Sequence, residues 1–411
     1  MGQTMAEKIL NHAANTRGRA AGEIVNASVS FLMTNDAVAE LTIQGLRAIN
    51  TAPWDHERIA VILDHYIPAT SENAARVHRL MRDFSREHGV HLYDQQGVCH
   101  QLMLENHVLP GDVIIGTDSH TCTYGGLGAF ATGVGSTDGA AVMATGKIWL
   151  KIPHTIRIEV IGSLPSHVHP KDVILYIIGK LGADGATYQA LEFAGPGMAA
   201  IDNAGRMTLC NMAIEAGAKT GIVEPDAVTE QYFKNRGNKG HLYKSDPDAQ
   251  FVRRMTVNLD QLVPQIACPW SVDQVVPVND VTGTSIDQAF IGSCTNGRIE
   301  DLRLAANVLA GKSVASHVRL LVTPASQSIY RQAMEEGVLA TFINAGAVIC
   351  NPGCSACFGG QGMLWKGEVC IGTHNRNFRG RMGHPESKVY LASPETTARS
   401  AVAGHIADPR Q

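Results

Sequence analysis

The chain has 411 residues, of which 45% are hydrophobic and 18% charged, a composition typical of a folded globular protein too long for one core. A formal net charge of -4 and the lack of a run of Lys and Arg argue against nucleic acid as a partner. The first ten residues lack the apolar core of a signal peptide, and no apolar run could span a bilayer. We therefore expect a cytoplasmic chain with no membrane partner.

The amino-terminal third alternates strand and helix patterns. Residues 58–67 and 112–120 predict short buried strands, while residues 73–89 repeat apolar side chains at helical spacing. Residues 122–146 are rich in Gly and Ala, which permits close approach of the backbone to a ligand or a neighbouring element. This alternation is typical of α/β architecture.

Two further α/β units follow in the sequence. Residues 151–172 predict a strand, a turn and the start of a helix, and residues 258–283 are Pro-rich and predict a linker or surface excursion. From residue 288 strand patterns alternate again with helix patterns, the longest helix being predicted at residues 328–346. We therefore predict an α/β fold of three α/β domains, at residues 1–153, 154–268 and 269–411.

The carboxyl-terminal region contains an unusual group of thiols, Cys350, Cys354 and Cys357. Nine cysteines are too few for a disulfide scaffold, and in an intracellular chain they are expected to stay reduced. The single Cys-x-x-Cys lacks the second half that a zinc ribbon needs. A redox pair and a metal or iron–sulfur site remain as alternatives.

A further thiol, Cys294, lies earlier in the chain in a similar setting, between a short apolar strand and a helical pattern. In an open α/β domain this turn and the loop with Cys354 and Cys357 would both leave the sheet at the carboxyl ends of strands. Three converging thiolates suit a metal or cluster with one open coordination position, which is typical of a catalytic site. The pattern indicates Lewis-acid chemistry.

Polar residues also follow predicted strands in the amino-terminal third. A lone His beside an Asp is most often a structural pair, whereas repetition at several strand ends favours a site for proton transfer. The residues are Asp64 and His65, His100, and Asp118, Ser119 and His120.

Two further sets of charged residues fit such a site. Glu192 precedes a Gly-Pro-Gly turn, where its carboxylate could orient a histidine from another domain or simply face solvent. Arg376 and Arg381 flank a loop that also holds Asn375, and Arg side chains bind carboxylates in a bidentate way. The loop therefore predicts a binding site for an acidic substrate.

Taken together and in order, the motifs "GTDSHT", "SCTN", "NPGCSACFG" and "NRNFRGRMG" resemble those of the aconitase superfamily. The longer phrases "SHTCTYGGLGAFATGVGSTD", "GRMTLCNMAIEAGAKTGIVEPD" and "GRMGHPESKVYLASPE" extend the resemblance over essentially the whole chain. More narrowly, the chain resembles the large subunits of the two-part isopropylmalate dehydratase and homoaconitase group. The resemblance implies the three α/β domains of the aconitase iron–sulfur core, without its swivelling fourth domain.

The resemblance also implies a cofactor and a reaction. A [4Fe-4S] cluster would be held by Cys294, Cys354 and Cys357, with Cys350 and Cys370 packed rather than ligating. The family's hydro-lyases move a hydroxyl between adjacent carbons of a 2-hydroxy acid, by dehydration and rehydration through a cis-alkene. The implied roles are an acid pair for the departing hydroxyl (Asp64, His65), a proton and hydrogen-bond network (His100, Asp118, His120, Glu192), substrate contacts (Asn35, Ser119) and carboxylate binding (Asn375, Arg376, Arg381).

In single-chain relatives a mobile fourth domain supplies a serine base and a substrate-binding arginine, and this sequence stops about where that domain would begin. We therefore expect a separate small subunit, in a heterodimer or heterotetramer, that closes over the cluster and excludes water. The resemblance favours 3-isopropylmalate as substrate, in leucine biosynthesis. Homocitrate, dimethylmalate or methylmalate, and maleate or citraconate are alternatives. A non-catalytic metal-binding or RNA-binding role would instead predict a basic surface and missing site residues.

Overall fold

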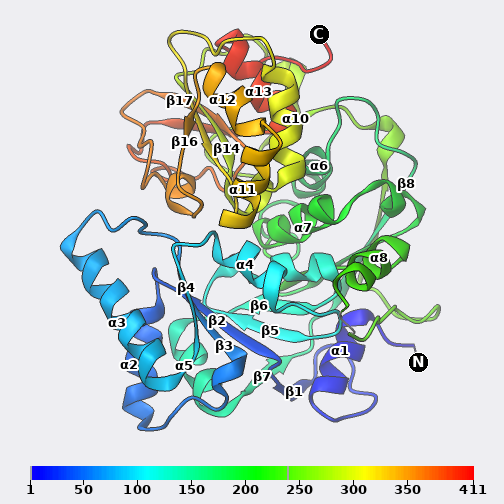
Figure 1. Ribbon diagram of the computed structural model, residues 1–411. Coiled ribbons are helices and arrows are strands. Elements are labelled where there is room, and N and C mark those ends of the chain that lie inside the picture. Colours follow the sequence, from blue (N-terminus) through cyan, green and yellow to red (C-terminus); the bar gives the residue numbers. More distant parts are fainter. Residues whose placement is uncertain (1, 238–239) are drawn as a thin grey trace. The chain divides into compact units, whose positions relative to one another are not determined.

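The computed structural model describes residues 2–237 and 240–411 (Figure 1). The chain forms two compact units, and each is assembled from separated segments. The first unit contains the residues up to Gln95, Leu102–Ile161 and Ala186–Val257, and the second contains Gln96–Gln101, Gly162–Gly185 and Asn258–Gln411. The predicted α/β fold is confirmed, and both large sheets contain neighbouring strands that run parallel. The predicted domain boundaries near residues 153 and 268 stay predictions.

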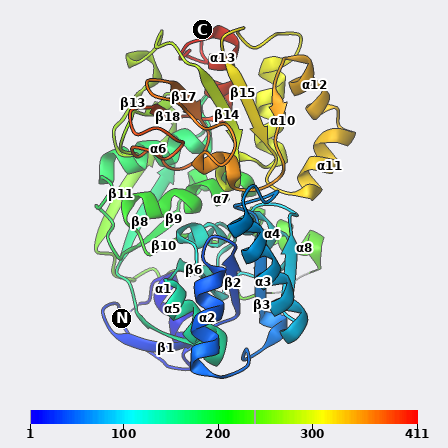
Figure 2. The same cartoon turned by 90° about the vertical axis from the view of Figure 1, so that its left-hand side faces the viewer.

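The first unit is built on a parallel five-stranded sheet of order β4-β3-β2-β5-β6. Its strands are β2 (Phe31–Asn35), β3 (Ile59–Leu63), β4 (His91–Asp94), β5 (Val113–Gly116) and β6 (Phe130–Gly133). The residues of β2, β3 and β5 are all buried, as expected for parallel strands covered on both faces. Helices α2 (Ala39–Ile49), α3 (Glu72–His88) and α5 (Ser136–Thr145) pack against the strands (Figure 2). The helix predicted at residues 73–89 is therefore confirmed.

The remaining elements of the first unit include a second, four-stranded sheet of order β10-β9-β8-β11. Its strands are β8 (Thr155–Ile161), β9 (Ala190–Ala194), β10 (Thr220–Val223) and β11 (Arg253–Asn258). Strands β1 (Ile24–Ser28) and β7 (Lys147–Lys151) form a separate antiparallel pair. The helices are α1 (Met5–Ala13), α7 (Asn203–Asn211), α8 (Ala227–Arg236) and α4 (Cys99–Asn106), which contributes residues to both units.

The glycine-rich stretch near residue 125 confirms the expected close approach of backbones, and the neighbour is another element of the fold. It forms the 3-10 helix η2 (Ser119–Leu127), which packs against α7 and β10. A Cβ atom on Gly125 would lie 1.7 Å from the carbonyl oxygen of Gly221, and one on Gly126 would lie 2.8 Å from the backbone of Met207. Only glycine fits at these two positions.

The second unit is built on a seven-stranded sheet of order β13-β12-β18-β17-β14-β15-β16. Its strands are β12 (Gln265–Ala267), β13 (Val275–Pro277), β14 (Gln288–Gly292), β15 (Arg319–Thr323), β16 (Val348–Ile349), β17 (Val369–Gly372) and β18 (Lys388–Leu391). The expectation that residues 258–283 form a linker is wrong, since β12 and β13 pair antiparallel at one side of this sheet. Each has only three residues, too few to show an alternating pattern between prolines.

The α-helices that lie wholly within the described part of the second unit are α6 (Pro170–Leu181), α9 (Ser293–Asn296), α10 (Ile299–Leu309), α11 (Gln327–Glu335), α12 (Val338–Asn344) and α13 (Pro394–Ala403). The single helix predicted at residues 328–346 is divided into α11 and α12 at Gly337, whose positive φ of 74° ends a helix readily. Among the described residues, no helix is both long and apolar enough to cross a membrane.

Candidate functional site

The three predicted cysteine ligands all lie in the second unit. Cys294 is in α9, directly after β14, and Cys354 and Cys357 are in the loop after β16. Strands β14, β15 and β16 are parallel neighbours, so both turns leave the sheet at the same edge. All three side chains are buried.

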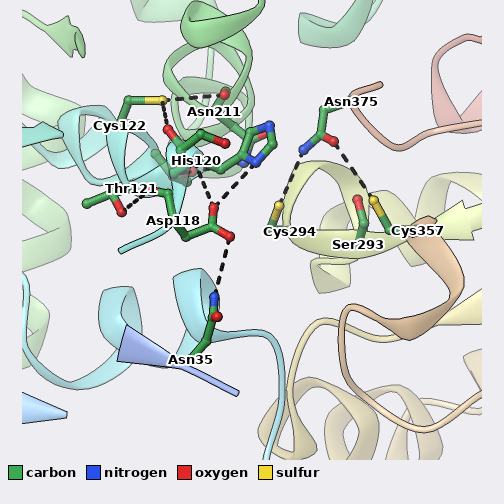
Figure 3. A network of polar contacts seen from close by, with 12 residues as sticks. Asn35, Asp118, His120, Thr121, Cys122, Asn211, Ser293, Cys294, Cys357 and Asn375 are labelled. Carbon is green, nitrogen blue, oxygen red and sulfur yellow. Dashed lines mark hydrogen bonds and ion pairs between the residues drawn. The ribbon is translucent and has the colours of Figure 1, made fainter. Parts of the chain in front are cut away.

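Asn375, from the loop after β17, contacts two of these cysteines (Figure 3). Its Nδ2 group donates to the Sγ atom of Cys294 at 3.6 Å, and its Oδ1 atom accepts from Cys357 at 3.9 Å. Arg381 donates from Nη2 to the Sγ atom of Cys357 at 3.1 Å and from Nε to the carbonyl oxygen of the same residue at 3.1 Å. Arg376 follows Asn375 and is half-buried. The structure thus brings the predicted carboxylate-binding loop to the cysteines.

The thiols in this region differ in acidity. A hydrogen bond from Cys354, assisted by the charge of Arg381, holds the pKa of Cys357 well below its usual value, although burial acts in the opposite direction. Burial raises the pKa of Cys350, and it raises the pKa of Cys370 to about 12. Because thiolates bind metals, Cys357 and its neighbours suit a metal or iron–sulfur group, whereas the other two have the character of packed thiols.

The turn that carries Cys294 depends on its neighbours in sequence. Gly292 adopts a φ of 148°, and a Cβ atom there would lie 2.4 Å from the carbonyl oxygen of Thr323. Arg298 is buried and donates to the carbonyl oxygens of Thr295 and Cys294, each at 2.8 Å. These contacts fix the backbone of the turn, so the cysteine is presented in one orientation.

In the first unit, Asp64 and His65 follow β3 as the sequence predicts. The Nδ1 atom of His65 lies 2.7 Å from Oδ1 of Asp64. The turn is held by Asp36, which sequence reasoning missed: its carboxylate accepts the backbone N–H groups of His65 and Tyr66, each at 2.9 Å, and lies 3.1 Å from Nε2 of His78. The available signal was its position at the carboxyl end of β2, next to Asn35.

The carboxylates of Asp64 and Asp36 raise the pKa of His65. Burial alone would lower the pKa of His65, but the charge of Asp64 and hydrogen bonds to Asp36 and Asp64 raise it well above its usual value. Burial likewise opposes ionisation of Asp36, yet hydrogen bonds from His65 and His78 hold its pKa far below the usual range. The raised pKa suits His65 to act as an acid.

A second predicted group, also in the first unit, surrounds Asp118 (Figure 3). Its Oδ1 atom accepts the backbone N–H of His120 at 2.8 Å, and Oδ2 accepts from Nδ2 of Asn35 at 3.4 Å and lies 3.9 Å from Nε2 of His65. Ser119 lies between Asp118 and His120 in the sequence and lines a cavity of about 540 Å³. Asn35, His65, Asp118 and His120 thus lie close together.

The carboxylate that orients His120 is Glu215, not Glu192. Its Oε1 atom lies 2.8 Å from Nε2 of His120, and both side chains are buried. Glu192 instead forms an ion pair with Arg157 and accepts from Ser245, so its expected pairing with a histidine is wrong. The physical reason is that Arg157, on the adjacent strand β8, already satisfies the buried carboxylate. A signal for Glu215 was present, since it lies within the phrase "GRMTLCNMAIEAGAKTGIVEPD".

The last predicted residue, His100, lies in α4 within the segment Gln96–Gln101 of the second unit, and its side chain is buried.

Comparisons with known proteins find relatives that are similar over their full length. The 3-isopropylmalate dehydratase large subunit 1 of Methanopyrus kandleri is 52% identical over 416 residues, covering 100% of this chain and 99% of the relative. A probable methanogen homoaconitase large subunit of Methanothermobacter thermautotrophicus is 50% identical over 417 residues, covering 99% of this chain and 97% of the relative.

The crystal structure of Thermococcus kodakaraensis aconitase X shares the fold, with a TM-score of 0.52 at 13% identity, and covers 90% of this chain and 88% of that one. The profile of the aconitase family (aconitate hydratase) matches residues 7–285 and 279–404. The chain therefore belongs to the aconitase family.

Proposed function

We propose that this chain is the large, cluster-binding subunit of a hydro-lyase that isomerises a 2-hydroxy acid by dehydration and rehydration through a cis-alkene. The observation that carries the proposal is the contact of Asn375 with both Cys294 and Cys357, beside Arg381. A group that binds carboxylates next to converging thiols suits an acidic substrate bound at a metal centre. The relatives named as dehydratase large subunits support the same reaction class.

Membership of the aconitase family implies an iron–sulfur cluster. In this chain Cys294, Cys354 and Cys357 would hold it, as a [4Fe-4S] cluster. When bound, the cluster supplies Lewis-acid assistance to the departure of hydroxide.

The chain's own residues would bind the substrate and move protons. Arg376 and Arg381, with Asn375, would hold a carboxylate of the substrate, and Asn35 and Ser119 would contact its remainder. His65, whose pKa is raised by Asp64 and Asp36, would donate its proton to the hydroxyl oxygen as the C–O bond breaks. Asp118, His120 with Glu215, and His100 would form the supporting hydrogen-bond network.

The proposal includes a partner and a preferred substrate. A small subunit would supply the swivel domain with the serine base that takes the proton from the adjacent carbon, and would exclude water from the closed site. We favour 3-isopropylmalate as the substrate, in cytoplasmic leucine biosynthesis, because relatives at 52% identity carry that name. Homocitrate is the second candidate, since a homoaconitase large subunit is 50% identical.

The test is turnover by the reconstituted complex. The chain is loaded with iron and sulfide under anaerobic conditions and mixed with its small subunit, and alkene absorbance is followed on isopropylmalate, homocitrate, dimethylmalate and citraconate. We expect turnover of isopropylmalate that requires both subunits. Turnover of homocitrate alone would reassign the substrate, and zinc uptake with no turnover of any acid would refute the hydro-lyase proposal.

A further inference from the structure

A buried lysine lies behind the cysteine-bearing turns of the second unit. Lys171, in the first turn of α6, is fully buried, and its Nζ group donates to the carbonyl oxygens of Thr373 at 2.6 Å and His374 at 2.7 Å. These two residues follow β17 and directly precede Asn375. A side chain from a distant part of the sequence thus holds the backbone that carries Asn375.

The same loop touches both turns that present cysteines. The Oγ1 atom of Thr373 accepts the backbone N–H of Gly292 at 2.9 Å, two residues before Cys294. Asn375 then contacts the thiols of Cys294 and Cys357. A shift of the loop would therefore change the contacts of both Cys294 and Cys357.

The start of α6 is itself fixed, so Lys171 is anchored at its base. His167 Nδ1 and His169 Nε2 each lie 2.8 Å from an oxygen of Glu395 in α13. The backbone N–H of His169 donates to the carboxylate of Asp172 at 2.8 Å, as does the backbone N–H of Gln265. Contacts with two other parts of the unit hold this end of the helix.

The surroundings of Lys171 are negatively charged. Burial lowers the pKa of Lys171 to about 7, while the negative charges of Asp301, Cys357, Asp172 and Cys294 act against this fall. A buried ammonium group is unfavourable unless charge and hydrogen bonds compensate it. A [4Fe-4S] cluster held by three thiolates carries net negative charge and would provide further compensation at this position.

We propose that Lys171 is a positioning residue of the cluster site. Its Nζ group donates to the backbone of Thr373 and His374, which keeps Asn375 against Cys294 and Cys357. In its protonated form it also adds a positive charge that interacts with the thiolates of Cys294 and Cys357. The electrostatic effect on a cluster rests on the proposed function, whereas the hydrogen bonds to the backbone concern the chain alone.

The test uses two variants and a control on the same helix. Lys171→Met keeps the aliphatic stem but removes the charge and the donors, and Lys171→Gln removes the charge but keeps an amide donor. Lys180→Met is the matched control, because Lys180 is exposed near the other end of α6. Circular dichroism establishes that each variant is folded.

The first readout is hydrogen–deuterium exchange of the full chain without iron, in the peptide that covers residues 370–378. Loss of the hydrogen bonds from Lys171 should make exchange there about tenfold faster in Lys171→Met, with a smaller change in Lys171→Gln and none in Lys180→Met. Unchanged exchange in a folded Lys171→Met would overturn the proposal. Failure of both Lys171 variants to fold would overturn it too, in favour of a purely structural role.

The second readout is the midpoint potential of the cluster in the reconstituted chain, followed by electron paramagnetic resonance. Removal of a nearby positive charge disfavours the added electron, so both Lys171 variants should have a more negative potential than the wild type and Lys180→Met. An unchanged potential would overturn the part of the proposal that assigns Lys171 an electrostatic effect on the cluster. If the wild-type chain takes up no cluster, the proposed function fails, and the exchange experiment still decides the role of Lys171.

Discussion

The pairing of His120 with Glu215 leads to a prediction at the scale of a single residue. Glu215→Gln replaces the carboxylate that contacts Nε2 of His120 with a neutral amide of the same shape. We expect kcat/KM of the reconstituted complex to fall by about 10²-fold or more, as for other acid–base groups, with little change in melting temperature.

Glu192→Gln provides the comparison, because the two glutamates are both buried and differ in their partners. This variant leaves Arg157 with a neutral neighbour, so a lower melting temperature is expected with kcat retained. A large loss of kcat in Glu192→Gln with full activity in Glu215→Gln would show that Glu192, and not Glu215, serves the reaction.

Site residues could be predicted from the sequence where they follow a recognisable strand pattern. Asp64 and His65 directly follow strand β3, and Asp118 and His120 lie in the turn and 3-10 helix after strand β5, positions that are visible in the sequence. Glu215 lies at a 3-10 helix in an Ala-rich stretch, and its partner His120 is far away in sequence. Lys171 was missed for a related reason, since nothing in its neighbourhood shows that an ammonium group at the start of a helix is buried.

At the scale of elements, the ion pairs of Glu395 join the start of α6 to α13 and predict a pH dependence. Although burial opposes ionisation, hydrogen bonds from His169 and His167 lower the pKa of Glu395 from 4.5 to about 2. Because the pKa is lower in the folded chain, the stabilisation is complete above 4.5 and is lost as the pH falls towards 2.

The measurement is the melting temperature of wild type and Glu395→Gln between pH 7 and pH 2. We expect the variant to melt at a lower temperature at pH 7, and the difference to narrow as the pH falls from about 4.5 to about 2. A difference that stays constant over this range would show that the ionised carboxylate is not what joins the two elements.

Elements were predictable where apolar side chains repeat over a sufficient length. Helix α3 and strand β3 agree with their patterns at residues 73–89 and 58–67. Strands β12 and β13 were missed because neither has a strand pattern of its own. They are stabilised by pairing with each other and, for β12, with the sequence-distant strand β18.

At the scale of the whole molecule, the sequence predicts the α/β class but not how segments are distributed between the two units. Residues 162–185, including α6, belong to the second unit although the segments on either side belong to the first. Which unit a segment joins depends on long-range packing, which hydrophobic periodicity does not reveal. The family, in contrast, could be inferred from motifs spread along the chain, and relatives similar over their full length agree.

We propose that, of the nine cysteines, Cys294, Cys354 and Cys357 alone hold an iron–sulfur cluster. The most direct measurement is iron content and visible absorbance after anaerobic reconstitution of single Cys→Ser variants. We predict that each of these three variants loses the cluster, whereas Cys350→Ser and Cys370→Ser retain it, because burial keeps those two thiols protonated. Loss of the cluster in Cys350→Ser, or its full retention in Cys294→Ser, would show that a different set of thiols holds the cluster.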